Sequence, residues 1–114
     1  MSHDLSLYTV SHTASIREAM ERIEANKHRV VVVVDEENRV VGTVSDGDLR
    51  RAFLHDVLPI APVTRIMQLN PHVTTETDPA RRHEIIRDEQ VTVLPVVTND
   101  NRLLDVELAY EPDF

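Results

Sequence analysis

The feature that most constrains the fold is an internal repeat. When the 114-residue chain is moved along itself by 63 positions, identical residues meet in one ungapped register. The matched pairs include Val10 and Val73, Ile23 and Ile86, Val33 and Val96, Asn38 and Asn101, and Arg39 and Arg102. Self-similarity at a fixed offset is typical of duplicated structural units. We therefore expect two similar units, residues 1–62 and 63–114.

Each unit is predicted to run strand, helix, strand, strand, and the first unit adds a further helix. An extended segment is expected around Ser6–Val10. Ser15 and Glu18 have the spacing of a capping box, which favours a helix starting there. The apolar residues that follow recur at helical intervals, namely Ile16, Ala19, Met20 and Ile23. Val30–Val34 is a β-branched run typical of a buried strand.

A hairpin and a second helix complete the first unit. Polar residues 35–38 predict a turn into a strand over 39–44. Ser45 or Asp46 is expected to cap the next helix. The apolar face of that helix is predicted to be Leu49, Ala52 and Phe53. Two prolines then mark the crossing between the units, Pro59 and Pro62.

The second unit follows the same order less regularly. Pro79 suits the first turn of a helix, whose apolar face rests mainly on Ile85 and Ile86. Residues 91–97 predict a buried strand and 103–106 its hairpin partner. The sequence ends before a final helix, so we expect the second unit to be shorter than the first.

Composition excludes several classes of protein. Hydrophobic residues make up 41% and charged residues 28%, which is ordinary for a soluble globular protein. The absence of cysteine excludes disulfides, thiolate metal sites and cysteine nucleophiles. No apolar stretch approaches the roughly 18 residues that span a membrane, and no signal peptide pattern opens the chain. We therefore expect a cytoplasmic protein that has no membrane partner.

Charge and the polar residues also argue against several functions. A net charge of −8 argues against a nucleic-acid partner. No serine, histidine and acid pattern suggests catalysis, so we expect no enzyme activity. Asp46 and Asp48 have the spacing of a glycosyltransferase metal motif, but such enzymes need a far larger fold. The histidines lack metal-ligand spacing and are expected on the surface, at positions 3, 12, 28, 55, 72 and 83. No metal site or required cofactor is therefore predicted.

The segment 42–49 closes one predicted strand and opens the next helix. Such a turn exposes backbone N–H groups that can bind a phosphate. Gly42 permits close approach of a backbone, and the Ser45 hydroxyl can donate to a phosphate oxygen. Asp48 offers two acceptor oxygens, which suit the paired hydroxyls of a ribose. The alternative is that Ser45 and Asp48 do no more than cap the helix.

This pattern of Gly42, Ser45 and Asp48 at three-residue intervals resembles the signature of the CBS domain. Together with the duplicated order of elements, the resemblance covers residues 5–108. It implies an α/β (α+β) fold of two β-α-β-β-α repeats related by a pseudo-twofold axis, the second repeat truncated. Such tandem pairs are called Bateman modules. The resemblance also implies that an adenine nucleotide lies between the strands, with Ser45 on its phosphate and Asp48 on its ribose.

Other residues are candidates for the same nucleotide site. Arg29 and Arg50 can neutralise a phosphate, because a guanidinium matches its geometry, whereas Arg51 is expected on a solvated helix face. Thr13 matches a CBS position near the ligand and has the alternative role of a turn residue. At the 63-residue offset the signature becomes Asp105, Leu108 and Glu111. We therefore expect one competent site per chain.

The resemblance implies a regulatory, non-catalytic function. The expected ligand is AMP, ADP, ATP or S-adenosylmethionine. The pair is similar to those that precede bacterial sugar-phosphate nucleotidyltransferase domains, which implies a possible downstream catalytic domain. The alternative is a ligand-free structural module for dimerisation, because paired CBS modules tend to form homodimers. Binding and dimerisation both remain open at this point.

Overall fold

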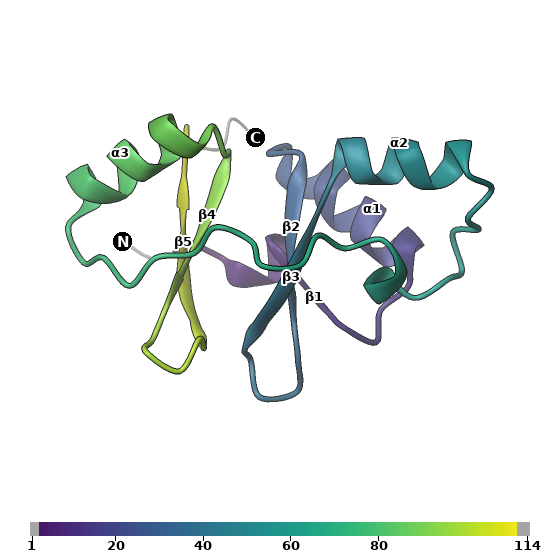
Figure 1. The fold of residues 1–114 in the computed structure, drawn as a ribbon, viewed down its shortest axis with the longest axis horizontal. Coiled ribbons are helices and arrows are strands. Elements are labelled where there is room, and N and C mark those ends of the chain that lie inside the picture. The colour runs from purple at the N-terminus through teal and green to yellow at the C-terminus, as the bar shows by residue number, and fades with distance from the viewer. Residues whose placement is uncertain (1–2, 112–114) are drawn as a thin grey trace.

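The computed structural model describes residues 3–111. Three α-helices, two short 3-10 helices and five strands follow one another along the described chain (Figure 1). Their bounds, in chain order, are η1 Leu5–Leu7, β1 Thr9–Ser11, α1 Ile16–Asn26, β2 Val30–Val34, β3 Val40–Ser45, α2 Asp46–Leu54, η2 Val63–Arg65, α3 Pro79–Glu89, β4 Val93–Val97 and β5 Leu103–Leu108. This mixed order of helices and strands confirms the predicted fold class.

The repeat seen in the sequence is also a repeat of structure. Helix α3 is α1 moved by 63 residues, and β4 and β5 are β2 and β3 moved by the same number. Both helices have 11 residues and end on a left-handed residue, Lys27 at φ 61° and Gln90 at φ 56°. Both hairpins carry a register shift at equivalent places, after Val33 and after Val96. The two units therefore share even their helix C-caps and the register shifts of their hairpins.

Five strands form two small sheets, one in each unit. In the first sheet β1 runs parallel to β2, and β2 is antiparallel to β3. The second sheet is the antiparallel pair β4 and β5, which Thr74 extends by a parallel bridge to Val96. The segment between α2 and α3 crosses both sheets (Figure 1) and bridges to β3 where Gln68 meets Thr43. That segment therefore joins the two units along one side.

The two hairpin turns bind each other with twofold symmetry. The N–H of Val40 donates to the carbonyl of Asn101 at 3.0 Å, and the N–H of Leu103 donates to the carbonyl of Asn38 at 2.9 Å. The Asn38 amide donates to the Leu103 carbonyl and the Asn101 amide to the Val40 carbonyl. Every partner in this set is 63 residues from its counterpart. These paired bonds lie on the predicted pseudo-twofold axis.

Apolar burial occurs in two clusters, and the second ties the units together. The first cluster lies inside the first unit, around Ile16, Ile23, Val31, Val33, Val44 and Leu49. The second contains side chains of both units, namely Tyr8, Val32, Val40, Val93, Val97, Leu103, Val106 and Leu108. Burial of apolar area is the main favourable term in folding, so the two units stabilise each other.

Three expectations from the sequence are wrong in detail. The segment predicted as extended at 6–10 begins as a 3-10 turn capped by Asp4, and the strand forms only from Thr9. Phe53 is 39% exposed, because α2 turns only Leu49 and Ala52 toward the core.

His28 is a buried residue and not a surface histidine. Its two ring nitrogens lie 2.8 Å from the carbonyl oxygens of Asn26 and Tyr110. The ring also stacks on that of Tyr110. Thr92 donates a hydrogen bond to the carbonyl oxygen of His28. These contacts join the start of β2 to the second unit.

Candidate functional site

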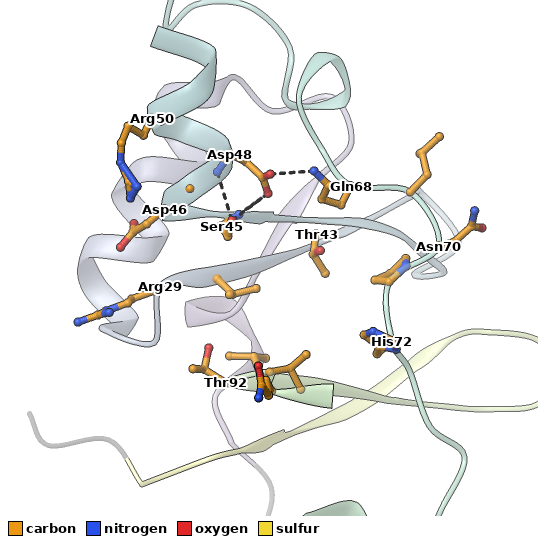
Figure 2. A pocket seen from close by; sticks show the side chains of 17 residues that line it. Arg29, Thr43, Ser45, Asp46, Asp48, Arg50, Gln68, Asn70, His72 and Thr92 are labelled. Atoms are coloured by element: carbon orange, nitrogen blue, oxygen red, sulfur yellow. Dashed lines mark hydrogen bonds between the residues drawn. The ribbon is translucent and has the colours of Figure 1, made fainter. Parts of the chain in front are cut away.

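A cavity of about 600 Å³ opens between the two units (Figure 2). The first unit supplies the start of β2, the end of β3 and the N-terminus of α2. The other walls are the crossing segment and the loop that leads into β4. The lining side chains labelled in Figure 2 are Arg29, Thr43, Ser45, Asp46, Asp48, Arg50, Gln68, Asn70, His72 and Thr92. The volume is that of an ordinary small-molecule site.

Helix α2 begins at this cavity with a complete capping box. The Ser45 hydroxyl accepts from the N–H of Asp48 at 3.2 Å, and the Asp48 carboxylate accepts from the N–H of Ser45 at 2.8 Å. Ser45 has extended backbone angles, as a helix N-cap residue requires. The capping function of these two residues is therefore present in the structure.

Asp48 is the most engaged polar side chain of the cavity. Only 5% of the residue is exposed. One carboxylate oxygen accepts from Arg51 at 2.7 Å and from Gln68 at 2.9 Å, and the other accepts from the N–H and the hydroxyl of Ser45. Burial alone would raise the pKa of Asp48, but these four hydrogen bonds outweigh it and hold the pKa below its ordinary value. Asp48 is thus held as a carboxylate.

Two guanidinium groups flank the same helix end. Arg29 precedes β2 in a left-handed conformation at φ 68°, and its carbonyl accepts from the N–H of Asp46 at 3.0 Å. Arg50 lies one turn further along α2. Within residues 3–111, neither guanidinium forms an ion pair or a hydrogen bond. A left-handed arginine costs on the order of 1 kcal/mol, and its counterpart in the second unit, Thr92, does not share the conformation.

The structure brings four of the six predicted site residues to the cavity. Arg29, Ser45, Asp48 and Arg50 all line it. Gly42 does not line the cavity. Its lack of a side chain lets the crossing segment pack closely against β3. A Cβ there would lie 2.8 Å from the carbonyl oxygen of Gln68, closer than packing allows.

Thr13 also lies outside the cavity lining. It is exposed in the loop between β1 and α1, where its hydroxyl bonds to that of Ser11 at 2.8 Å. The sequence allowed two roles for Thr13, in the ligand site or in a turn, and this geometry is that of a turn residue.

Several lining residues were missed from the sequence. Gln68, Asn70 and His72 come from the part of the crossing segment after η2, which belongs to no helix or strand and has no periodic pattern to place it. Thr92 could have been predicted as a lining residue, because it is the counterpart of Arg29 at the 63-residue offset. Buried and half-buried residues alternate along β3. Thr43 is one of the half-buried residues, so its side chain points to the face of the strand opposite the core, into the cavity (Figure 2).

The equivalent positions of the second unit are used differently. Leu108, the counterpart of Ser45, is 2% exposed and belongs to the core between the units. Asp105, the counterpart of Gly42, accepts from the N–H groups of His3 and Val106. Between β5 and residue 111 the described chain starts no helix. Residues 3–111 also contain no cluster of acids and histidines able to hold a metal ion and no helix long and apolar enough to cross a membrane.

Comparison with known proteins identifies this architecture. Residues 1–55 match the family model of the CBS domain. The structure superposes on the CBS domain protein PAE2072 from Pyrobaculum aerophilum, solved in complex with AMP, with a TM-score of 0.72 and 22% identity. The match covers 91% of this chain and 85% of that protein. The fold is that of the CBS domains.

Two curated relatives are similar to this chain over part of a longer sequence of their own. An uncharacterized protein, RP505, of Rickettsia prowazekii is 31% identical over 84 residues, which are 71% of this chain and 26% of that protein. The arabinose 5-phosphate isomerase GutQ of Escherichia coli K12 is 28% identical over 104 residues, which are 90% of this chain and 32% of that protein. The chain therefore spans about a quarter to a third of the length of these relatives.

Proposed function

We propose that this CBS pair is a regulatory, non-catalytic module that binds one adenine nucleotide in the cavity between its units. The observation that carries the proposal is the set of groups around the N-terminus of α2. Two guanidinium groups without assigned partners, Arg29 and Arg50, stand beside a helix N-terminus at the edge of a cavity of ligand size. Phosphate is the group that two such guanidinium groups bind best, because a guanidinium matches its geometry.

The ligand is arranged along the cavity in a definite order. The phosphate lies toward Arg29, Arg50 and the hydroxyl of Ser45, and the ribose lies over Asp48. The base lies between the strands, within reach of Thr43 and the opposing Thr92 (Figure 2). The AMP bound to PAE2072, a protein with the same fold, supports an adenine nucleotide as the ligand class.

Asp48 needs a free lone pair before it can accept from a ribose hydroxyl. All four of its acceptor positions are engaged by groups of the chain itself. The Ser45 hydroxyl can release one of them by rotating its proton from the Asp48 carboxylate to the phosphate. The capping bond from the N–H of Ser45 stays in place during this exchange. Helix capping and ligand binding are then simultaneous uses of the same two residues.

Regulation follows from the position of the cavity between the units. A ligand that contacts Arg29 and Ser45 in one unit and Thr92 in the other favours the arrangement in which all three lie close. The module then reports the nucleotide concentration as a change in packing or rigidity. Cytoplasmic location is part of this proposal, since free adenine nucleotides are abundant there.

Calorimetric titration with AMP tests the proposal. We expect a single class of sites, and we expect Arg50→Gln to weaken binding about tenfold, since a hydrogen bond between charged groups contributes about 1.5 kcal/mol. Arg17→Gln is the matched control, because Arg17 is exposed on α1 and does not line the cavity. Absence of heat up to millimolar AMP, or equal losses in both variants, contradicts the proposed site.

Self-association is a second candidate function, and a patch of exposed apolar residues favours it. The patch lies at the end of α2 and in the loop after it, and consists of Leu54, Leu58 and Ile60, exposed by 75%, 65% and 83%. Large exposed patches often mark protein interfaces. We expect a homodimer in sedimentation experiments and dissociation of that dimer by Leu54→Glu. A monomer at all concentrations contradicts this candidate.

The proposal also includes a catalytic partner domain that the module regulates. The sequence resemblance pointed to a sugar-phosphate nucleotidyltransferase, whereas the enzyme among the relatives described above is a sugar-phosphate isomerase. The shared feature is an enzyme that acts on a sugar phosphate. The reading frame around these 114 residues tests this part directly, and an attached domain without a sugar-phosphate site contradicts it.

A further inference from the structure

We propose that the cavity selects adenine nucleotides with a single phosphate, and that Asp46 is the residue that sets this specificity. The inference rests on the proposed function and names the ligand class of the same site. It is carried by the balance of charge around the start of α2 and by the small number of free N–H groups there.

Asp46 stands between the two arginines that would bind the phosphate. Its own N–H donates to the carbonyl of Arg29 at 3.0 Å, so the two backbones are in contact. Arg50 follows Asp46 by four residues on α2, which places both on one face of the helix. Figure 2 shows the Asp46 carboxylate on the side of the cavity where the two guanidinium groups lie.

The net charge around the start of α2 limits how many phosphates a bound nucleotide can carry. Asp48 already has a cationic partner, because Arg51 binds its carboxylate at 2.7 Å. The groups left for a ligand are the cations Arg29 and Arg50 and the anion Asp46, a net charge of one positive. A single phosphate carries about −1.5 to −2 at neutral pH. It can be met by two guanidinium groups, but each further phosphate brings negative charge next to Asp46 without a new cation.

Most backbone donors of the first turn are also already in use. The N–H groups of Ser45, Asp46 and Asp48 donate to the Asp48 carboxylate, the Arg29 carbonyl and the Ser45 hydroxyl. Two carboxylates in the first turn further offset the positive end of the helix dipole. A chain of phosphates, which needs many N–H donors, finds few of them here.

Titration with AMP, ADP, ATP and S-adenosylmethionine in 0.15 M salt tests the inference. We expect affinity to fall from AMP to ADP to ATP. Between AMP and ATP the ratio should be on the order of fivefold, as for one charge contact of about 4 Å in water. Asp46→Asn should reduce that ratio toward one by strengthening ATP binding more than AMP binding. Glu24→Gln, which removes a charge from the exposed face of α1, is the control and should leave the ratio unchanged.

The possible results separate this inference from the proposed function. Equal or tighter binding of ATP, tighter binding of S-adenosylmethionine, or an unchanged ratio in Asp46→Asn overturns the single-phosphate selection while nucleotide binding stands. Absence of binding by all four ligands overturns the proposed function itself and the selection with it. Circular dichroism of Asp46→Asn checks that α2 is intact.

Discussion

At the scale of single residues, Asp48 serves the folded chain before any ligand arrives. Its carboxylate caps α2 through the N–H of Ser45 and ties the crossing segment to the helix through Gln68. Because the residue is almost fully buried, loss of its negative charge leaves hydrogen-bond donors without their acceptor. A substitution at Asp48 therefore changes folding as well as any binding, and the two effects need separate measurements.

The lowered pKa of Asp48 predicts how stability depends on pH. A carboxyl whose pKa is lower in the folded chain contributes stability above its ordinary value of 3.8, and that contribution is lost as the pH falls through the folded pKa. At neutral pH, Asp48→Asn should cost about 1.5 kcal/mol of unfolding free energy. Urea denaturation from pH 7 to pH 3 should show the difference between the two proteins shrinking below about pH 4. A difference that is constant with pH contradicts this account of Asp48.

Arg29 allows strain and function to be separated. Glycine adopts its left-handed backbone without a steric penalty, so Arg29→Gly should leave the unfolding free energy unchanged or raise it by up to about 1 kcal/mol. The same substitution should weaken AMP binding at least tenfold, because a phosphate-binding guanidinium is lost. Arg87→Gln removes an exposed arginine of α3 and serves as the charge control. Full AMP affinity in Arg29→Gly contradicts a role for Arg29 in binding.

At the scale of elements, the pair of hairpin turns holds the two units in their symmetric arrangement. Asn38 and Asn101 each adopt a left-handed backbone, at φ 64° and 71°. Each also donates its side-chain amide to the other unit's hairpin. Asparagine is well suited to this position, because it tolerates left-handed angles and carries the amide donor.

Substitutions in these turns should have symmetric effects. Asn38→Ala and Asn101→Ala should each lower the unfolding free energy by about 2 kcal/mol, the sum of a left-handed penalty and one lost hydrogen bond. The matched variants Asn38→Gly and Asn101→Gly keep the backbone free and should lose about half as much. Chemical denaturation measures all four. Equal losses for alanine and glycine would show that the left-handed angle costs nothing here.

Elements with a local signal were predictable, and those positioned by distant contacts were not. The apolar spacing of 16–23 and the valine run of 30–34 predicted α1 and β2 correctly, since each pattern specifies its own structure. The sequence did not reveal that Phe53 would face solvent, because helix α2 has a core neighbour on one side only. His28 is buried by Tyr8 and Tyr110, residues distant in the sequence, and no local pattern marks it.

Site residues divide in the same way. Ser45 and Asp48 were found because their spacing is fixed by the start of one helix. Gln68, Asn70 and His72 were not found, since the crossing segment is held beside the cavity by bridges to Thr43 and Val96, which are distant in the sequence. Close backbone approach at Gly42 was predicted, but not that the approaching backbone would be that of Gln68 in the crossing segment. Contacts within one element were readable from the sequence, and contacts between elements required the fold.

At the scale of the whole molecule, the core shared by the two units makes them one folding unit. Val32 and Val40 of the first unit are buried in the same cluster as Val106 and Leu108 of the second. We expect thermal unfolding followed by circular dichroism and by tyrosine fluorescence to give one coincident transition. Val106→Ala should lower the stability of both units together by about 2 kcal/mol. Two separate transitions would contradict a shared core.

The central claim is that one adenine nucleotide binds per chain, in the cavity between the units. Amide chemical shifts recorded by NMR during titration with AMP test it most directly. The account predicts saturable shifts at Arg29, Ser45 and Asp48 and across the cavity at Thr92, with a stoichiometry of one. Unchanged spectra at millimolar AMP, or shifts centred elsewhere in the molecule, would contradict it.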